Sequence, residues 1–270
     1  MQYLIEILSY PFAVRALCVG VLLSLCSALL GVNLVLKRMS MLGDGLSHVS
    51  FGAAAVALAL GFAPLEFSIP LVIIAAFLLL WLQNKNIGGD AAIAVISSGA
   101  LAVGITVASL TTGMNTDISS YMFGSILALA KRDVAVSIVC AAVVMTVYLL
   151  FYHKIFIAAL DPDFARAIGV RVKLYDGITA VLTAVLTVIG MRVMGALLIS
   201  SIITVPALSA MRCAKSYRGT VICAAVFSVA AFLAGITLSF AYDLPTGAAV
   251  VLCNLTIFAF LTVKNGITSR

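Results

Sequence analysis

The sequence predicts an all-α fold, a polytopic membrane bundle of eight or nine transmembrane helices that forms a single domain over residues 1–270. Two observations predict it. The 270 residues are 64% hydrophobic and only 10% charged, whereas a soluble domain averages about a quarter charged residues. Apolar segments of about 20 residues, the length of a helix that crosses a bilayer, recur along the whole chain.

The apolar segments are joined by short polar connections, and the longest polar stretch, about 153–172, is too short for a soluble catalytic domain. We expect the spans at 14–36, 44–63, 67–83, 91–111, 133–152, 173–190, 193–211, 219–241 and 246–263. Only Gly190, Met191 and Arg192 separate the sixth span from the seventh, so these two could instead form one bent element and a short helix. This ambiguity leaves eight or nine spans.

The basic residues indicate how the bundle is oriented. The net charge is +6, and the strongest basic clusters lie between spans, at Lys37–Arg38, Lys154–Lys173 and Arg212–Arg218. Cytoplasmic loops carry an excess of lysine and arginine. The opposite loops, 63–66, 111–120 and 242–247, contain neither residue. The pattern predicts a cytoplasmic C-terminus and, with nine spans, an external N-terminus, and it gives no indication of nucleic-acid binding.

Lys131 and Arg132 break this pattern, because the same topology puts them outside. They follow a short apolar stretch, Tyr121–Ala130, whose ten residues are too few to cross a bilayer. We therefore interpret this stretch as a re-entrant or interfacial helix.

Asp44 and His48 are the most informative polar residues. The chain has ten acidic residues and two histidines, and this pair lies one helical turn apart just inside the second span. Residues at i and i+4 share a helix face. Ionisable groups in a membrane helix usually face a water-filled route or a partner. One oxygen donor and one nitrogen donor also suit a transition-metal ion.

One chain supplies only these two obvious ligands, but a twofold dimer would bring four donors together across its axis. The alternative interpretation is structural. In that case Asp44 caps the N-terminus of the second span and His48 hydrogen-bonds a neighbouring helix.

A second candidate site is the cytoplasmic stretch between the fifth and sixth spans. Aspartate followed by proline is typical of a helix start and glycine of a helix end, which predicts a helix of about two turns. It could dock a soluble partner through Phe164, Ala165 and Ile168, or simply lie on the membrane surface. The residues of this site are Asp161, Pro162, Asp163, Phe164, Ala165, Arg166, Ala167, Ile168 and Gly169.

A third candidate is Asp243, in the turn 242–247 that proline and glycine predict between the last two spans. Its carboxylate could attract cations at an external pathway entrance. The turn pattern itself favours a solvated turn residue over this role.

Several motifs are absent. The chain has no G-x-x-x-x-G-K-[ST], so it cannot bind ATP through a P-loop, and no H-E-x-x-H or G-x-S-x-G of a hydrolase. Any energy must come from a partner or an ion gradient. The six cysteines form no C-x-x-C pair, which argues against a disulfide or zinc framework.

Taken in order, several stretches resemble the permease subunits of the bacterial ABC transporters for zinc, manganese and iron. The stretch Lys37–His48 is similar to the family's glycine-aspartate and serine-histidine pattern. Asp161–Gly169 is similar to the helix that such permeases insert into a cleft of their ATPase. Further similarities are Tyr121–Ser125 on the outer side, Gly195–Ser201, and Asp243–Gly247 before the last span.

The resemblance implies a homodimer in the bacterial cytoplasmic membrane. Its partners would be two copies of a cytoplasmic ATP-binding subunit and an extracellular or periplasmic metal-binding protein. Asp44 and His48 of both subunits would form a metal site in the pathway, and 161–169 would be the coupling helix. The divalent metal cation would be the substrate, with no permanently bound cofactor and no catalysis by this chain.

The alternative from another class is an ATP-independent metal–proton antiporter or channel. It would use the same aspartate and histidine, but it would have no need of a helix that docks an ATPase.

Overall fold

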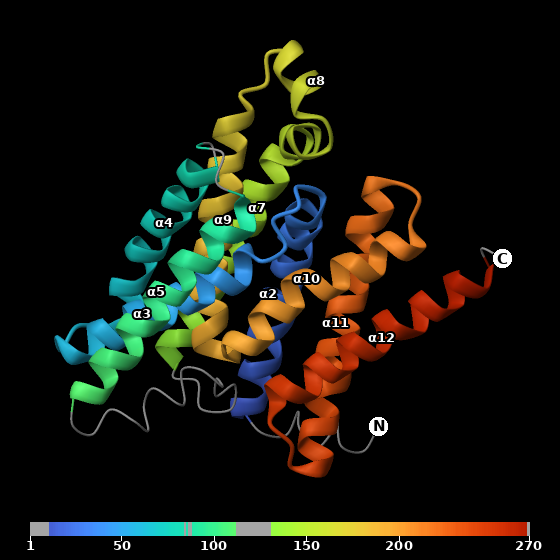
Figure 1. The fold of residues 1–270 in the computed structure, drawn as a ribbon. Coiled ribbons are helices and arrows are strands. Elements are labelled where there is room, and N and C mark those ends of the chain that lie inside the picture. Colours follow the sequence, from blue (N-terminus) through green and yellow to red (C-terminus); the bar gives the residue numbers. More distant parts are fainter. Residues whose placement is uncertain (1–10, 84, 86–87, 112–130, 269–270) are drawn as a thin grey trace.

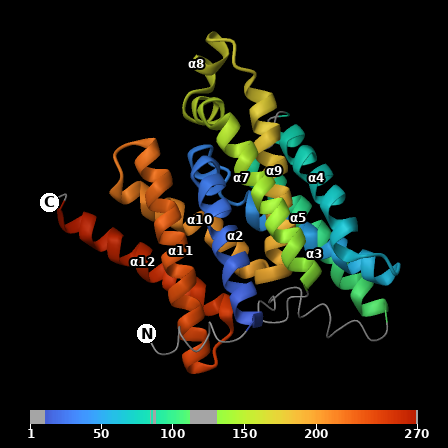
Figure 2. The same ribbon diagram turned by 180° about the vertical axis from the view of Figure 1, so that it is seen from behind.

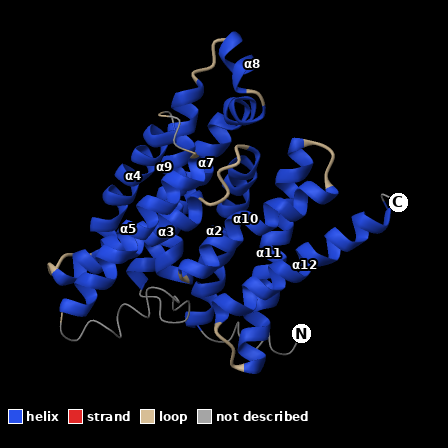
Figure 3. Ribbon diagram, in the orientation of Figure 1, coloured by secondary structure: helices blue, strands red, loops and turns tan. Residues whose placement is uncertain are grey.

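The structure is a computed structural model that describes residues 11–83, 85, 88–111 and 131–268, and every regular element in these ranges is a helix (Figure 3). Nine of the described helices are long and apolar enough to cross a membrane. The predicted membrane bundle is therefore confirmed, with nine spans among the described residues. The helices are α2 (Pro11–Leu36), α3 (Leu42–Ala59), α4 (Pro64–Gln83), α5 (Gly89–Leu110), α7 (Lys131–Leu160), α8 (Pro162–Ala167), α9 (Val172–Met194), α10 (Ala196–Cys213), α11 (Tyr217–Tyr242) and α12 (Thr246–Thr268).

Two of the differences between the predicted and observed boundaries have a clear physical cause. The fifth span was expected to end at 152, but α7 continues to Leu160, because no helix-breaking residue occurs before Asp161 and Pro162. The break between the sixth and seventh spans lies at Gly195, with φ +89°, and Gly190 is helical. Gly190 instead allows close packing, since a Cβ there would lie 2.3 Å from the Ile199 side chain.

The loops that connect the helices lie at two opposite ends of the bundle. Figures 1 and 2 show α8, the α2–α3 connection and the α10–α11 connection at one end, and the α3–α4 and α11–α12 turns at the other. The basic clusters that were assigned to the cytoplasm thus share one end of the molecule. We refer to it below as the cytoplasmic end.

Two arginines at the opposite end are paired with carboxylates. Arg132 donates from Nη2 to Oε1 of Glu66 at 2.6 Å, and Nη2 of Arg192 lies 3.6 Å from Oδ2 of Asp133. Arg132 therefore lies at the end opposite the basic clusters, as the expected topology requires, and the Glu66 carboxylate offsets its charge. The expected re-entrant helix, Tyr121–Ala130, lies outside the described residues.

The helices α2, α3 and α9 are the most buried of the nine. Small residues allow their neighbours to approach closely, which is how membrane helices commonly pack. A Cβ on Gly31 of α2 would lie 1.8 Å from the carbonyl oxygen of Ile203 on α10. A Cβ on Gly52 of α3 would lie 2.4 Å from that of Ala100 on α5.

A buried polar triad, which the sequence did not reveal, joins α2, α7 and α11. Nδ2 of Asn33 donates to the Tyr148 hydroxyl at 2.8 Å, and the Tyr217 hydroxyl donates to Oδ1 of Asn33 at 2.9 Å. The two hydroxyls are themselves 2.9 Å apart. Interhelical hydrogen bonds of this kind average about 0.6 kcal/mol in a membrane protein, so the triad fixes the relative positions of the three helices more than it adds stability.

Candidate functional site

The two predicted ligands lie at the start of α3. The structure places Oδ2 of Asp44 3.7 Å from Nε2 of His48, which is too long for a hydrogen bond. Their side chains are 41% and 30% exposed, although both residues belong to a segment apolar enough to span the membrane. Partly exposed ionisable groups at such positions face an aqueous route or a second chain rather than lipid.

The structure does not support the capping interpretation of Asp44. The N-cap of α3 is Met41, no side chain caps it, and Asp44 lies within the first turn. The Ser47 hydroxyl donates to the backbone carbonyl of Asp44 at 2.7 Å. The Asp44 carboxylate is therefore not needed to complete the start of the helix.

The glycines on either side of Asp44 set the position of this turn. A Cβ on Gly43 would lie 3.0 Å from Cδ1 of Ile203 on α10, and one on Gly45 would lie 2.5 Å from Cγ2 of Ile93 on α5. The first turn of α3 is thus wedged between two helices that larger residues would push apart. This close fit limits how far Asp44 can move relative to α5 and α10.

The spacing of the two donors suits a metal ion. Two ligands that are each about 2.1 Å from a tetrahedral ion are roughly 3.4 Å apart, close to the 3.7 Å between Asp44 and His48. Among the described residues there is no group of three or more His, Cys, Asp or Glu side chains that could hold a metal. A complete site would therefore need donors from beyond this set.

The connection that leads into α3 is held from two sides. The Lys37 ammonium forms an ion pair with Asp176 of α9, and both side chains are largely buried. The Thr204 hydroxyl of α10 donates to the carbonyl of Ser40 at 3.2 Å. An aspartate inside a predicted span, Asp176, is the sequence signal for such an ion pair.

The predicted cytoplasmic helix is present as α8. Asp161 caps its N-terminus, accepting hydrogen bonds from the backbone amides of Asp163 at 3.1 Å and Phe164 at 2.9 Å. Gly169, with φ +81°, ends the turn. The helix has six residues, somewhat less than the two turns expected.

The three apolar residues assigned to one face of this helix have different environments. Phe164 and Ile168 are 55% and 51% exposed, whereas Ala165 is fully buried. Of these three residues, only Phe164 and Ile168 form an apolar surface that is accessible to a partner.

Asp243 does not lie with the other candidates. It is the C-cap of α11, in the left-handed conformation at φ +54°, and it is exposed at the external end. The structure thus gives it a clear local role in the turn.

The chain was compared with known proteins. The sequence profile of the ABC 3 transport family matches residues 9–265. The high-affinity zinc uptake system membrane protein ZnuB of Haemophilus influenzae is 29% identical over 250 residues, covering 92% of this chain and 96% of that protein. The manganese transport system membrane protein MntC of Halalkalibacterium halodurans is 27% identical over 269 residues, covering 98% and 92%.

Two solved structures share the fold. PsaBC from Streptococcus pneumoniae in complex with Fab superposes with a TM-score of 0.86 at 24% identity, covering 96% of this chain and 94% of that chain. An inward-facing conformation of a putative metal-chelate type ABC transporter gives a TM-score of 0.76 at 17% identity, covering 94% and 85%.

Proposed function

Because the chain belongs to the ABC 3 transport family, we propose that it is the membrane-spanning permease of an ATP-driven importer of divalent transition-metal cations. It is a multi-pass protein of the bacterial cytoplasmic membrane, and ATP hydrolysis belongs to a separate ATPase subunit. The named relatives transport zinc or manganese. The proposed substrates are therefore zinc, manganese or iron, with iron resting on the resemblance noted in the sequence.

The observation that carries this proposal is the Asp44–His48 pair. Its two donors are spaced for one ion, partly exposed, and set within a membrane-spanning helix. In a homodimer the pair from each copy would supply four donors around a twofold axis. Carboxylate and neutral imidazole would lower the cost of dehydrating the ion while leaving it weakly enough bound to exit.

The proposed energy source acts through α8. The exposed Phe164 and Ile168 would enter a cleft of the ATPase, one ATPase copy for each permease copy. Four residues separate the end of α8 from the start of α9, and Asp176 of α9 pairs with Lys37 at the entry to α3. When the ATPases close on ATP, their movement would be transmitted to the proposed metal site through the buried helix α9 and the ion pair of Lys37 with Asp176.

At the external end, an extracellular or periplasmic metal-binding protein would deliver the ion. Asp243, exposed beside the external turn, would attract cations to this mouth. Its role as a helix C-cap is compatible with this, because the cap uses the backbone amide of Asp243 and the residue is exposed.

The test is metal uptake by an Asp44→Ala/His48→Ala double variant, expressed with its ATPase and binding protein in a strain that lacks the gene. Uptake of zinc, manganese and iron, each measured separately, should fall to background while the ATPase still co-purifies. His153→Ala, which removes the other histidine of the chain, is the matched control and should transport normally.

Undiminished uptake by the double variant would refute the proposed site. Uptake by this chain without any ATPase, driven by a proton gradient, would instead favour the antiporter.

A further inference from the structure

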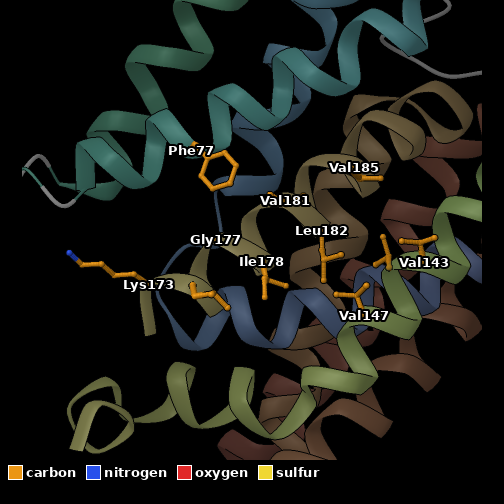
Figure 4. A pocket seen from close by; sticks show the side chains of 11 residues that line it. Phe77, Val143, Val147, Lys173, Gly177, Ile178, Val181, Leu182 and Val185 are labelled. Atoms are coloured by element: carbon orange, nitrogen blue, oxygen red, sulfur yellow. The ribbon is translucent and has the colours of Figure 1, made fainter. Parts of the chain in front are cut away.

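An apolar groove runs along the outside of the bundle on the helices α4, α7 and α9. It has a volume of about 640 Å³. Figure 4 shows Phe77 of α4 on one side, Val143 and Val147 of α7 on the other, and Lys173 at one end. No residue of α3 lines it, so the groove is separate from the Asp44–His48 site.

Glycine and small apolar residues leave the groove open along α9. A Cβ on Gly177 would meet only the Phe77 ring, at an ordinary 3.5 Å. Phe77 and Val143 are about half exposed, at 50% and 53%. The groove is therefore a surface feature that lipid can enter from the side.

The length of the groove matches one leaflet of a bilayer. From Lys173 to Val185 the helix α9 rises about 18 Å at 1.5 Å per residue, and both residues line the groove. Half of a hydrocarbon core of about 30 Å is about 15 Å. An acyl chain that enters beside Lys173 would thus reach roughly the middle of the membrane at Val185.

The residues at the cytoplasmic end of the groove are of the types that lie beside lipid headgroups. The only tryptophan of the chain, Trp81 of α4, is 55% exposed there, and the Lys85 ammonium lies 5.5 Å from the centroid of its ring. The Lys154 ammonium of α7 lies 5.9 Å from the centroid of the Tyr175 ring. Tryptophan and lysine in these positions are typical of a membrane–water interface.

Three lysines therefore lie at this end, namely Lys85 just after the end of α4, Lys154 on α7 and Lys173 on α9. Lysines at this depth attract anionic lipid headgroups. The apolar groove and the basic rim together fit one kind of occupant, a molecule with a long hydrocarbon chain and a negative head.

We propose that the groove on α4, α7 and α9 is a binding site for an anionic phospholipid of the cytoplasmic leaflet. One acyl chain lies between Phe77 and Val147 along α9, and the phosphate contacts Lys173. Helix α9 is the next helix after α8 in the chain. The bound lipid therefore stabilises the position of α9, the helix that would transmit motion from the ATPase. This site goes beyond metal transport and does not depend on which metal is carried.

The experiment measures lipid retention by the full-length protein purified from a defined mixture of phosphatidylglycerol and phosphatidylcholine with identical acyl chains. Retained lipid is counted by native mass spectrometry. The wild-type protein should retain phosphatidylglycerol preferentially. Lys173→Gln should reduce that preference about fivefold, the effect expected of one lysine near an anionic surface, and its matched control is the exposed Lys215→Gln at the same end.

A second pair of variants tests the groove itself. Val181→Phe places a ring on the floor of the groove and should abolish retention of both lipids, whereas Val226→Phe, on a lipid-exposed part of α11, should not. Equal retention of both lipids by the wild type, or Lys173→Gln behaving like Lys215→Gln, would overturn the proposal. So would a Val181→Phe variant that changes the oligomeric state but keeps its lipid, since the groove would then bind protein.

Discussion

Replacing Gly52 by alanine is the sharpest test of how α3 is held beside the proposed metal site. Gly52 follows His48 by one helical turn, and its added Cβ would lie 2.4 Å from the carbonyl oxygen of Ala100 on α5. Cβ atoms essentially never approach a heavy atom closer than 3.0 Å. The obstacle is backbone, so it cannot rotate away as a side chain would, and α3 and α5 must separate.

The size of the effect follows from the geometry. The contact must lengthen from 2.4 to at least 3.0 Å, that is by about 0.6 Å. Overpacking of this kind costs about 1–3 kcal/mol, while alanine in place of glycine in a helix gains about 0.5–1 kcal/mol. The steric cost exceeds the gain, and we expect a net loss of roughly 1–2 kcal/mol.

Gly99→Ala on α5 is the matched control, because its Cβ would have nothing within 4 Å. It removes a helical glycine without the clash, so it should raise the free energy of unfolding slightly. Thermal unfolding of both variants in nanodiscs, followed by circular dichroism, should give shifts of opposite sign. Metal uptake at a temperature where both are folded should fall only for Gly52→Ala. If Gly52→Ala unfolds at or above the temperature of Gly99→Ala, the packing argument is wrong.

Two further predictions concern the proposed route from the ATPase to the proposed metal site. Lys37→Ala should uncouple ATP hydrolysis from metal uptake and lower stability by up to about 3–5 kcal/mol, the cost of removing one partner of a buried pair. The charge-swapped Lys37→Asp/Asp176→Lys variant should recover part of the lost metal uptake and part of the lost stability. If its uptake does not recover, the ion pair does not transmit motion. Phe164→Asp/Ile168→Asp, at two exposed positions of α8, should abolish co-purification of the ATPase while the unfolding temperature stays unchanged. An ATPase that still co-purifies with this variant would rule out α8 as the docking element.

The sequence was sufficient for the features that depend on length and local spacing. Span length predicted eight or nine membrane helices, of which the described residues contain nine, and proline and glycine placed the start and end of α8. The i, i+4 spacing placed Asp44 and His48 on one face of α3, and the structure confirms that they are neighbours.

The sequence was insufficient where contacts between helices decide the outcome. In a soluble helix the polar face shows which side is buried, but a helix that is apolar all round carries no such contrast. Asn33 bonds to Tyr148 and Tyr217, and Lys37 pairs with Asp176, in each case more than a hundred positions along the chain. Nothing in one span predicts which other span will face it.

The same limitation explains why Gly190 was taken for a break when the break is at Gly195. Glycine has two uses in a membrane helix, as a residue with positive φ and as a site of close approach, and composition does not distinguish them. Gly195 has φ +89° and ends α9, whereas Gly190 receives the side chain of Ile199 from the next helix. Helix α9 therefore stays intact from Val172, near the proposed ATPase contact, to Met194 at the far end. An unbroken helix that is among the most buried in the bundle can carry a displacement of α8 to Asp176, and from there through Lys37 to the start of α3.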